Sequence, residues 1–174
     1  MVYFSADYHF SHRNIIRYCN RPFSSIEEMN QTIIDNVNSV VGAKDTLYFL
    51  GDWCMGGSDK IKSFREQINS NHLKMVLGNH DKGIKPGTLF ESVKDIDEYK
   101  CNGIHIVMCH YAFRSWKNSC HGSYHIFGHS HNTLPNYGLS FDCGIDGHNF
   151  MPWSLDEVVE KMNIITIDSS TKII

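Results

Sequence analysis

The chain has 174 residues, of which 41% are hydrophobic and 20% charged, and these ordinary values suit one globular domain with a single large core. The 16 Lys and Arg residues against 19 Asp and Glu residues give a formal net charge of −3, which argues against a broad nucleic-acid-binding surface. The opening stretch MVYFSADYHFSHRN has neither the basic leader nor the apolar core of a signal peptide, and no apolar run is long enough to cross a bilayer.

The cysteines stand at positions 19, 54, 101, 109, 120 and 143, and no two of them form a C-x-x-C pair. In a chain without an export signal, free thiols are expected rather than a disulfide framework. The same spacing argues against a structural zinc protein, because closed tetrahedral zinc sites are rich in cysteine. We therefore expect a cytoplasmic protein that makes no membrane contact.

Strands and helices alternate over the first half of the chain. Short apolar runs predict strands at 2–6, 46–50 and 73–77, and helices are expected at 11–19, from 26 to about 40, and around 61–68. Ser25 and Glu28 form a capping box at the start of the second helix. This alternation predicts a largely parallel sheet.

The second half of the chain, after about Lys82, is richer in β-structure. Strands are predicted at 104–109, 124–127 and 137–141, with loops between them. A helix is expected to begin after Ser154, with Glu157 as its capping partner, and residues 164–167 are expected to form a closing strand. We find no repeat, low-complexity segment or linker, so residues 1–174 are expected to form one domain.

Polar side chains follow five of the predicted strands, at the point where each strand ends. They are Asp7 and His9 after the first, Asp52 after the second, Asn79, His80 and Asp81 after the third, His110 after the fourth, and His129 and His131 after the fifth. Ligands gather at the carboxyl ends of strands in α/β sheets, so these side chains are expected to converge. Glycines precede several of them, which allows tight turns and close backbone approach.

The nitrogen and oxygen ligands at these strand ends outnumber those that one metal ion needs. Two metal ions about 3.5–4 Å apart and sharing a carboxylate would use them all. Mixed imidazole and carboxylate ligands suit Mn, Zn, Fe or Ni better than Mg or Ca, which prefer oxygen shells. Each residue alone has an ordinary alternative, such as a core position for His110 or a turn for Asp52 and Asn79. The five strand ends together favour a site for two divalent metal ions.

These residues carry a resemblance to the calcineurin-like metallophosphoesterases. The similar segments are Asp7-Tyr8-His9, Gly51-Asp52, Gly78-Asn79-His80-Asp81, His110 and Gly128-His129-Ser130-His131, in that family's order across residues 7–131. The stretches HFSHRNIIRYCNRPF and FDCGIDGHNFMPWSLDEV resemble a small bacterial or phage-type branch without a cap domain. The resemblance implies an α/β fold, namely a single-domain αββα sandwich of two mixed β-sheets flanked by helices.

The resemblance also implies a role for each residue of these segments. One metal ion would be held by Asp7, His9 and His131, the other by Asn79, His110 and His129, and Asp52 would bridge the two. A hydroxide held between the metals would attack phosphorus, since metal binding brings the pKa of water from about 16 towards neutrality. His80 would stabilise the transition state or protonate the leaving oxygen, and Asp81 would orient the His80 ring.

Substrate-binding residues are expected beside the metal ligands. Asn79 and His80 belong to the motifs, Arg13 could bind phosphate near the start of the first helix, and Trp116 could stack on a base. A solvated helix face and simple loop packing are the alternatives for Arg13 and Trp116. Further candidates, with the same ordinary alternatives, are His12, Arg17, Arg21, His148 and Asn149.

We expect a metal-dependent phosphoric ester hydrolase, and specifically a phosphodiesterase that acts on small nucleotide-type substrates. The reason is that a complete ligand set occurs in a short chain with no cap domain, which leaves the site open and shallow. A nuclease acting on DNA or RNA ends and a phosphomonoesterase are the alternatives within enzymes, since the same two-metal core serves all three. A non-catalytic metal-binding scaffold of the same fold is the alternative outside enzymes, but such proteins are expected to lose ligands or His80.

Overall fold

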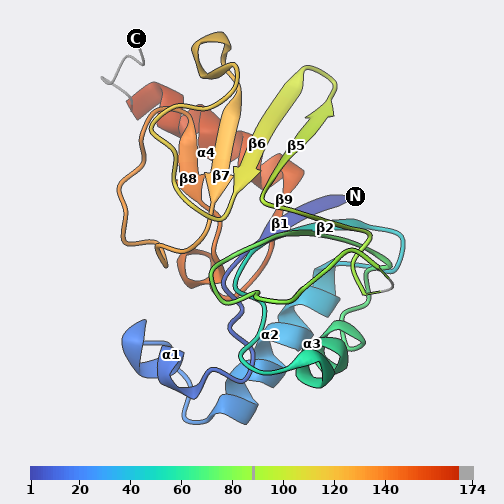
Figure 1. Ribbon diagram of the computed structural model, residues 1–174. Coiled ribbons are helices and arrows are strands. Elements are labelled where there is room, and N and C mark those ends of the chain that lie inside the picture. Colours follow the sequence, from blue (N-terminus) through green and yellow to red (C-terminus); the bar gives the residue numbers. More distant parts are fainter. Residues whose placement is uncertain (88, 169–174) are drawn as a thin grey trace.

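Two mixed β-sheets form the centre of the protein, whose computed structural model describes residues 1–87 and 89–168 (Figure 1). The first sheet has the strand order β4-β3-β2-β1-β9. Its strands are β1 (Val2–Ser5), β2 (Thr46–Leu50), β3 (His72–Val76), β4 (Ser92–Lys94) and β9 (Trp153–Ser154). The first four are parallel to their neighbours, and β9 pairs antiparallel with β1. The carboxyl ends of β1, β2 and β3 therefore lie at one edge of this sheet.

The second sheet has the strand order β5-β6-β7-β8. Its strands are β5 (Ile96–Cys101), β6 (Ile104–Cys109), β7 (Tyr124–Phe127) and β8 (Ser140–Asp142). β5 and β6 form an antiparallel hairpin around Asn102 and Gly103, which both have positive φ as a tight hairpin turn requires. β6, β7 and β8 are parallel, so their carboxyl ends also share one edge.

Helices cover the outer face of the first sheet. They are α1 (Arg13–Tyr18), α2 (Ile26–Val40) and α3 (Ser58–Arg65), and α2 supplies a buried stripe of Met29, Ile33, Ile34 and Val37. The α2 stripe packs with Leu47, Phe49, Leu73 and Met75 of the sheet in one hydrophobic cluster. The predicted cap of α2 forms in part, because Ser25 accepts a hydrogen bond from the backbone N–H of Glu28 while the Glu28 carboxylate binds Ser24 instead.

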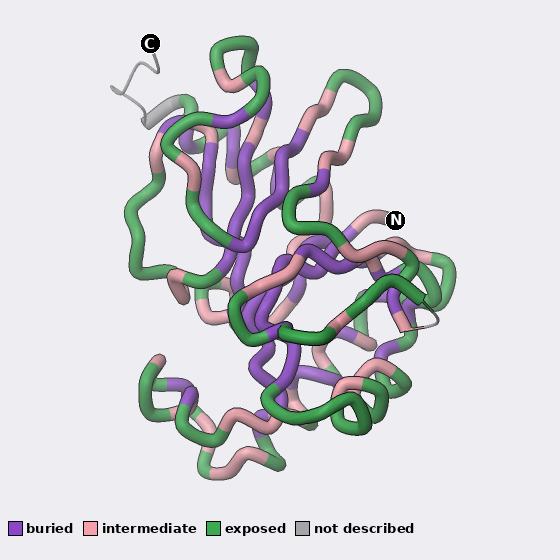
Figure 2. Tube along the Cα trace, viewed as in Figure 1, coloured by how far each residue is buried: buried purple, intermediate pink, exposed green. Residues whose placement is uncertain are grey.

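A second hydrophobic cluster fills the space between the two sheets. Its members include Phe4 and Leu50 from the first sheet, Met108 and Ile126 from the second, and Val158, Met162 and Ile165 from the last helix, α4 (Leu155–Asp168). Buried chain in Figure 2 accordingly runs along the central strands of both sheets, and exposed chain along the loops. The expected architecture of two mixed sheets flanked by helices is confirmed.

The far face of the second sheet is covered by the loop between β6 and β7, which includes a short 3-10 helix at Ser119–His121. His125, which is buried on this face, stacks on Phe113 at 4.8 Å between ring centroids and lies 5.4 Å from the ring of Trp116. Its Nδ1–H donates to the carbonyl of Val107, and its Nε2 accepts from the N–H of Phe113. The loop is thus fastened to the sheet by one buried histidine.

The structure corrects two predicted elements. The strand predicted at 137–141 is found at Ser140–Asp142, so residues 137–139 lie outside it. Residues 164–167 do not form a strand, because α4 continues to Asp168 and buries Val158, Met162 and Ile165 at helical spacing against the sheets. Tertiary packing overrides the β-propensity of this isoleucine-rich run. The strands predicted at 46–50, 104–109 and 124–127 are confirmed, and all six cysteines are free thiols as expected. Within the described ranges, no helix is long and apolar enough to span a membrane.

Candidate metal centre

The loops that follow the strands stay paired beyond the strand ends, and this pairing brings the polar side chains together. The backbone N–H of Asp7 donates to the carbonyl of Gly51 at 3.0 Å, and that of His9 donates to the carbonyl of Asp52 at 2.9 Å. The N–H of His129 reaches across from the second sheet to both carboxylate oxygens of Asp7, at 2.9 and 3.1 Å. The two sheets are therefore joined at the strand ends by a carboxylate.

The backbone is strained where it delivers the predicted ligands. Asp7, His9, Asp52, His129 and His131 all have positive φ, between 47° and 67°. This left-handed conformation is uncommon for residues other than glycine, and it persists only where the surroundings enforce it, typically at functional sites. The clustering of such residues at one edge of the two sheets indicates a built site rather than ordinary turns.

Two glycines leave the space that the carboxylates occupy. A Cβ atom on Gly78 would lie 2.4 Å from Oδ1 of Asp52, and one on Gly128 would lie 2.8 Å from Oδ2 of Asp7. Any larger residue would collide with these side chains. The glycines that precede the polar residues in the sequence are therefore explained by close packing of the site.

The candidate ligand atoms form overlapping groups. The groups Asp7–His9–His131 and Asp52–His110–His129 each offer ligand atoms within 4.8 Å of one another. Asp52 lies between the groups, because its Oδ2 is 3.4 Å from Nε2 of His9 and 3.5 Å from Nε2 of His110. Asn79 completes the second group, with its Oδ1 3.3 Å from Nε2 of His110. All seven predicted metal ligands are thus brought together.

The first group fits a bound cation. Both ring nitrogens of His9 are buried and have no hydrogen-bond partner among the described residues, since its approach to Asp52 lacks hydrogen-bond geometry. Burial lowers the pKa of His9 to about 2, which leaves a neutral imidazole with a free lone pair. Burial also raises the pKa of Asp7 to about 8, and the nearby Asp142 and Asp52 carboxylates add to this rise. A metal ion would satisfy the His9 lone pair and the Asp7 carboxylate together.

The bridging carboxylate is held in its charged form. Burial alone would raise the pKa of Asp52, but its interaction with His110 and the N–H of His80 at 2.9 Å lower that pKa to about 2. Nδ1–H of His110 donates to the carbonyl of Leu50 at 2.7 Å, so Nε2 is the ring nitrogen that faces Asp52. This is how a metal-binding imidazole is usually oriented.

Two residues that the sequence analysis did not assign to the metal site, Asp146 and Arg21, fix the ring of His131. Asp146, which lies in a 3-10 helix at Ile145–Gly147, accepts a hydrogen bond from Nδ1–H of His131 at 2.8 Å. Arg21 is buried and grips both oxygens of Asp146, at 2.7 and 2.8 Å, while also donating to the carbonyls of Asp7 and Tyr8. Burial would lower the pKa of His131, but Asp146, then Cys19 and then Asp7 raise it to about 10 in the metal-free chain. These carboxylates therefore attract positive charge to this position.

A sixth strand end also contributes to the site. Asp142, at the end of β8, accepts from the N–H of Gly144 at 2.7 Å, from the N–H of Asn132 at 2.9 Å, and from the hydroxyl of Ser130. It thereby shapes the loop that carries His129 and His131. The pattern of polar residues at strand ends could have identified Asp142, because the run from Ser140 to Asp142 ends in the same way as the other five.

The structure corrects the role of Asp81. One of its carboxylate oxygens accepts from the N–H groups of Asp52 and Gly78, at 2.7 and 2.8 Å, and the other accepts from the N–H of Trp53 at 2.8 Å. Asp81 is buried and binds backbone, so it does not orient the His80 ring as predicted. It ties the ends of β2 and β3 together and acts on the chemistry only through Asp52.

Two histidines lie at the mouth of the site. Nε2 of His80 is 4.0 Å from Oδ2 of Asp52, and its ring centroid is 5.2 Å from that of His9. The ring of His12 lies 5.4 Å from His9 and 5.8 Å from His80, although the sequence analysis named His12 only as a further phosphate-binding candidate. His80 is the more exposed of the two. Both can reach a group bound at the metal ligands.

The substrate-binding predictions have mixed outcomes. Trp116 is buried and donates its indole N–H to the carbonyl of Ser123 at 3.0 Å, so it packs the loop and is not free to stack on a base. Arg21 is likewise committed to Asp146 and cannot bind phosphate. Arg13 is exposed at the start of α1, and its role stays a prediction. His148 stacks on Trp153 at 3.8 Å and lies 3.6 Å from a Glu157 oxygen.

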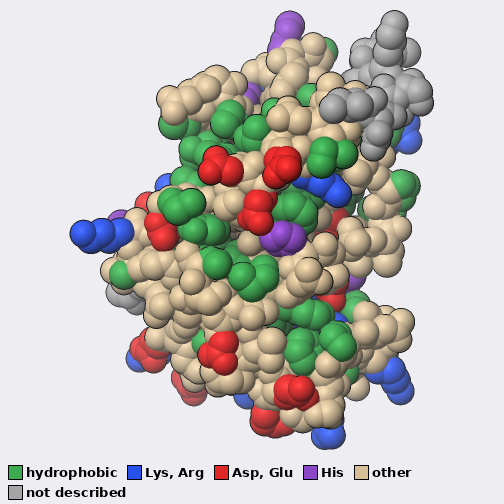
Figure 3. Space-filling model, turned by 180° about the vertical axis from the view of Figure 1, so that it is seen from behind, with side chains coloured by type: hydrophobic (Ala, Val, Ile, Leu, Met, Phe, Trp, Pro, Cys, Tyr) green, Lys and Arg blue, Asp and Glu red, His purple; other side chains and the backbone are tan. Residues whose placement is uncertain are grey.

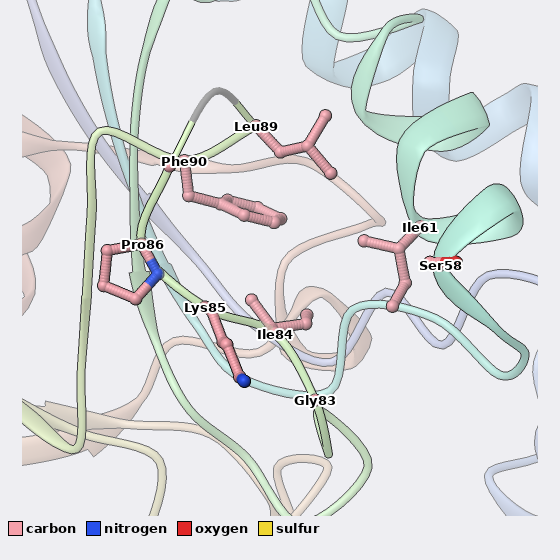
Figure 4. A pocket seen from close by; sticks show the side chains of 9 residues that line it. Ser58, Ile61, Gly83, Ile84, Lys85, Pro86, Leu89 and Phe90 are labelled. Carbon is pink, nitrogen blue, oxygen red and sulfur yellow. The ribbon is translucent and has the colours of Figure 1, made fainter.

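A separate cavity of about 230 Å³ lies between α3 and the segment that follows His80 and Asp81 (Figure 4). Ile61 of α3 faces Ile84 across it, and Phe90 and Leu89 form another wall. None of the described residues that line it is a predicted metal ligand. The cavity is therefore separate from the candidate metal centre, which is the open cluster at the strand ends.

Comparison with known proteins gives one relative with high sequence identity. The uncharacterized protein MJ1445 of Methanocaldococcus jannaschii is 38% identical over 168 residues, which cover 91% of this chain and 89% of the archaeal protein. No family model matches the chain.

Solved structures give the fold. A protein of unknown function from Aquifex aeolicus, AQ665, has a TM-score of 0.73 at 23% identity, covering 92% of this chain and 98% of its own, which is a likeness of fold. The phosphoesterase Yfce from E. coli has a TM-score of 0.43 at 14% identity, covering 82% of this chain and 77% of its own. That second likeness is too weak to bear on the fold or function of this chain.

Proposed function

The chain belongs to one family with the archaeal protein MJ1445, and from the ligand cluster at its strand ends we propose that it is a calcineurin-like metallophosphoesterase that hydrolyses phosphoester bonds with two divalent metal ions. A small phosphodiester of nucleotide type is the proposed substrate. The free thiols support a reducing cytoplasmic location as part of the same proposal.

The observation that carries this proposal is the position of Asp52. One oxygen of its carboxylate faces His9 of the first ligand group and His110 of the second, as a bridging ligand must. Metal ions bound on either side of it would supply an activated water and neutralise the charge on the phosphoryl group. The mixed imidazole and carboxylate donors favour Mn, Zn, Fe or Ni over Mg.

The other residues around Asp52 orient the ligands, donate a proton or bind the phosphoryl group. Arg21 and Asp146 keep the His131 ring in one orientation, and Asp81 keeps the loops after β2 and β3 at a fixed spacing. His80 is exposed at the mouth, where its imidazole can donate a proton to the oxygen of the leaving group. Asn79 is exposed beside it and can donate its amide N–H to a phosphoryl oxygen while its carbonyl faces the metal site.

The open mouth supports a diester of small size. Asn79, His80 and His129 are all exposed, so an organic group can extend from phosphorus on either side. On the face shown in Figure 3, Lys and Arg side chains are scattered singly among acidic and apolar ones. The net charge of −3 favours a small nucleotide over a long nucleic acid, whose backbone would require a continuous basic track.

The test is hydrolysis of bis-p-nitrophenyl phosphate beside p-nitrophenyl phosphate, on metal-stripped protein supplied with Mn²⁺, Zn²⁺, Ni²⁺ or Mg²⁺. We expect activity only with metal, a preference for the diester, and two metal ions bound per chain. Asp52→Ala should lower the activity by more than the roughly 10–100-fold that loss of an outer partner of a metal ligand costs.

The matched control is Asp35→Ala, because Asp35 is an exposed carboxylate on α2 that accepts a hydrogen bond from Gln31 of the same helix. It should keep both the activity and the metal content. An active Asp52→Ala protein, or a wild-type chain that binds fewer than two metal ions, would overturn the proposal. A preference for the monoester would keep the enzyme class and reject the diester.

A further inference from the structure

Two tyrosine rings are exposed at the rim of the metal centre. Tyr111 is 44% exposed, and its ring centroid lies 5.0 Å from those of His110 and His129. Tyr18 is 61% exposed and lies 6.3 Å from the ring of His12. Among the large hydrophobic side chains that are exposed in the described part of the chain, these two are the aromatic ones. Both adjoin histidines of the site.

Exposure of an aromatic ring is costly unless another flat group covers it, and the other rings of this chain illustrate the usual outcome. Trp116 and Phe113, in the same loop as Tyr111, pack against the sheet around His125. Tyr111 instead makes T-shaped contacts with the imidazoles of His110 and His129, at 76° and 68°, and remains open to solvent. Its position gives a ligand at the metal centre a flat surface to cover.

The two ends of the site differ in chemistry. His80 and His12, which can exchange protons, lie on the side of His9, and Tyr18 continues that side. Tyr111 lies beside the other ligand group, His110 and His129. A diester bound with its leaving oxygen near His80 would therefore direct its retained ester group towards Tyr111.

We propose that Tyr111 is a stacking platform for the nucleobase of the substrate, so that the site takes a nucleoside phosphodiester whose base is on the retained group. This inference rests on the proposed phosphodiesterase function. Stacking of a base on an aromatic side chain tolerates any base, so the platform selects nucleosides in general rather than one sequence. The stacking role that the sequence analysis gave to Trp116 belongs to a residue five positions earlier in the same loop.

The kinetic test uses two diesters with the same leaving group, thymidine 5′-p-nitrophenyl phosphate and methyl p-nitrophenyl phosphate, on the metal-loaded enzyme. The measured quantity is the ratio of kcat/KM for the two esters. Tyr111→Ala should lower this ratio by about 5- to 150-fold, the range that loss of one stacked base produces. Tyr111→Phe, which keeps the ring, should retain the ratio, and so should the control Ile164→Ala, an exposed apolar side chain on α4.

A binding test separates this inference from the proposed function. Adenosine 5′-monophosphate and ribose 5-phosphate are titrated onto the metal-loaded chain by calorimetry. We expect tighter binding of the nucleotide, and loss of that difference in Tyr111→Ala. If neither ester is hydrolysed but the difference is present and is lost in the variant, the phosphodiesterase function fails and the base platform stands.

A ratio of kcat/KM, or of affinities, that is the same in wild type and Tyr111→Ala would overturn the platform. If kcat/KM falls equally for both esters, the Tyr111 ring only supports His110 and His129.

Discussion

Arg21 illustrates how single residues of this chain act on the site from outside it. Its guanidinium is buried, binds Asp146 through two hydrogen bonds, and donates to the carbonyl of Asp7. A buried ion pair of this kind adds little net stability, but removal of one partner is costly because the other charge stays buried. Here Asp146 also bonds to His131, so the pair sets the orientation of a metal ligand.

We expect Asp146→Asn to weaken metal binding by about 10–100-fold, the usual cost of losing the partner of a metal-binding histidine. The same change should lower the free energy of unfolding by about 3–5 kcal/mol, because Arg21 is left unpaired. Metal affinity is measured by competition with a chromophoric chelator, under conditions in which the variant is folded.

Asp156→Asn is the control, since Asp156 is an exposed carboxylate in the first turn of α4. It should leave metal affinity unchanged. An Asp146→Asn protein that binds metal as tightly as wild type would show that the hydrogen bond to His131 does not matter for binding.

At the scale of strands and loops, the site depends on how closely neighbouring strand ends approach. The loops after β2 and β3 are separated only by the hydrogen atom of Gly78, since a Cβ there would lie 2.4 Å from an Asp52 oxygen and 2.6 Å from its backbone nitrogen. Asp81 then clamps both loops through three backbone N–H groups. The strand ends thus behave as one rigid unit.

We expect Gly78→Ala to lower the free energy of unfolding by about 1–3 kcal/mol, as overpacking does. It should also lower metal affinity, because the Asp52 carboxylate must move. Gly57→Ala, at the start of α3, is the matched control, since a Cβ there meets nothing within 4 Å. Urea unfolding and metal titration of both variants give the answer, and equal effects of the two substitutions would refute the packing argument.

The part of the candidate site that could be predicted from sequence is the part whose residues directly follow strands. The convergence of the seven candidate ligands was predictable because each follows an apolar run, and that pattern is local in the chain. The partner of His131 was not, because Arg21 and Asp146 are separated by 125 positions and neither follows a strand directly. Asp81 was assigned to its neighbour His80, whereas its hydrogen bonds cross to the loop after β2.

The prediction of strands and helices was wrong or incomplete where the local sequence pattern and the tertiary packing disagreed. Residues 164–167 have the composition of a strand, yet they continue α4, whose Ile165 packs in the second core. β5 was missed because its run IDEYKC mixes charged and apolar residues, and its pairing with β6 depends on the Asn102-Gly103 turn. β9 has two residues, too few for any periodicity.

For the molecule as a whole, buried titratable groups make the stability of the metal-free chain depend on pH. Burial raises the pKa of Asp7 from 3.8 to about 8 in the folded state, whereas the unfolded chain ionises this group near its ordinary value. Between those values the folded state holds the extra proton, so its stability falls as pH rises. His131, with its pKa raised from 6.5 to about 10, acts in the same direction. His9, with its pKa lowered to about 2 in the folded state, has the opposite effect: it makes the stability rise with pH, and only below pH 6.5.

We therefore expect the metal-free protein to lose stability from pH 7 to pH 8, by up to about 1.4 kcal/mol for each such group. With Mn²⁺ or Zn²⁺ bound, the cation replaces the protons, so this loss should disappear and metal affinity should rise with pH. Urea unfolding after chelator treatment, with and without metal, measures both effects. Asp7→Asn should flatten the metal-free profile, and a metal-free protein that gains stability over this interval would contradict the assignment.

The strand order of the first sheet has a consequence for how the protein is made. β1 lies between β2 and β9, and these two neighbours are separated by about a hundred residues of chain. At ribosomal speeds of roughly 5–20 residues per second, about 5–20 s pass between the synthesis of β2 and that of β9, the second partner of β1. Two later parts of the site are also synthesised late. They are the N–H of His129, which donates to the Asp7 carboxylate, and Asp146, which orients His131. A nascent chain therefore exposes its first candidate metal ligands before the residues that complete the site are synthesised. We expect the metal ions to bind after translation.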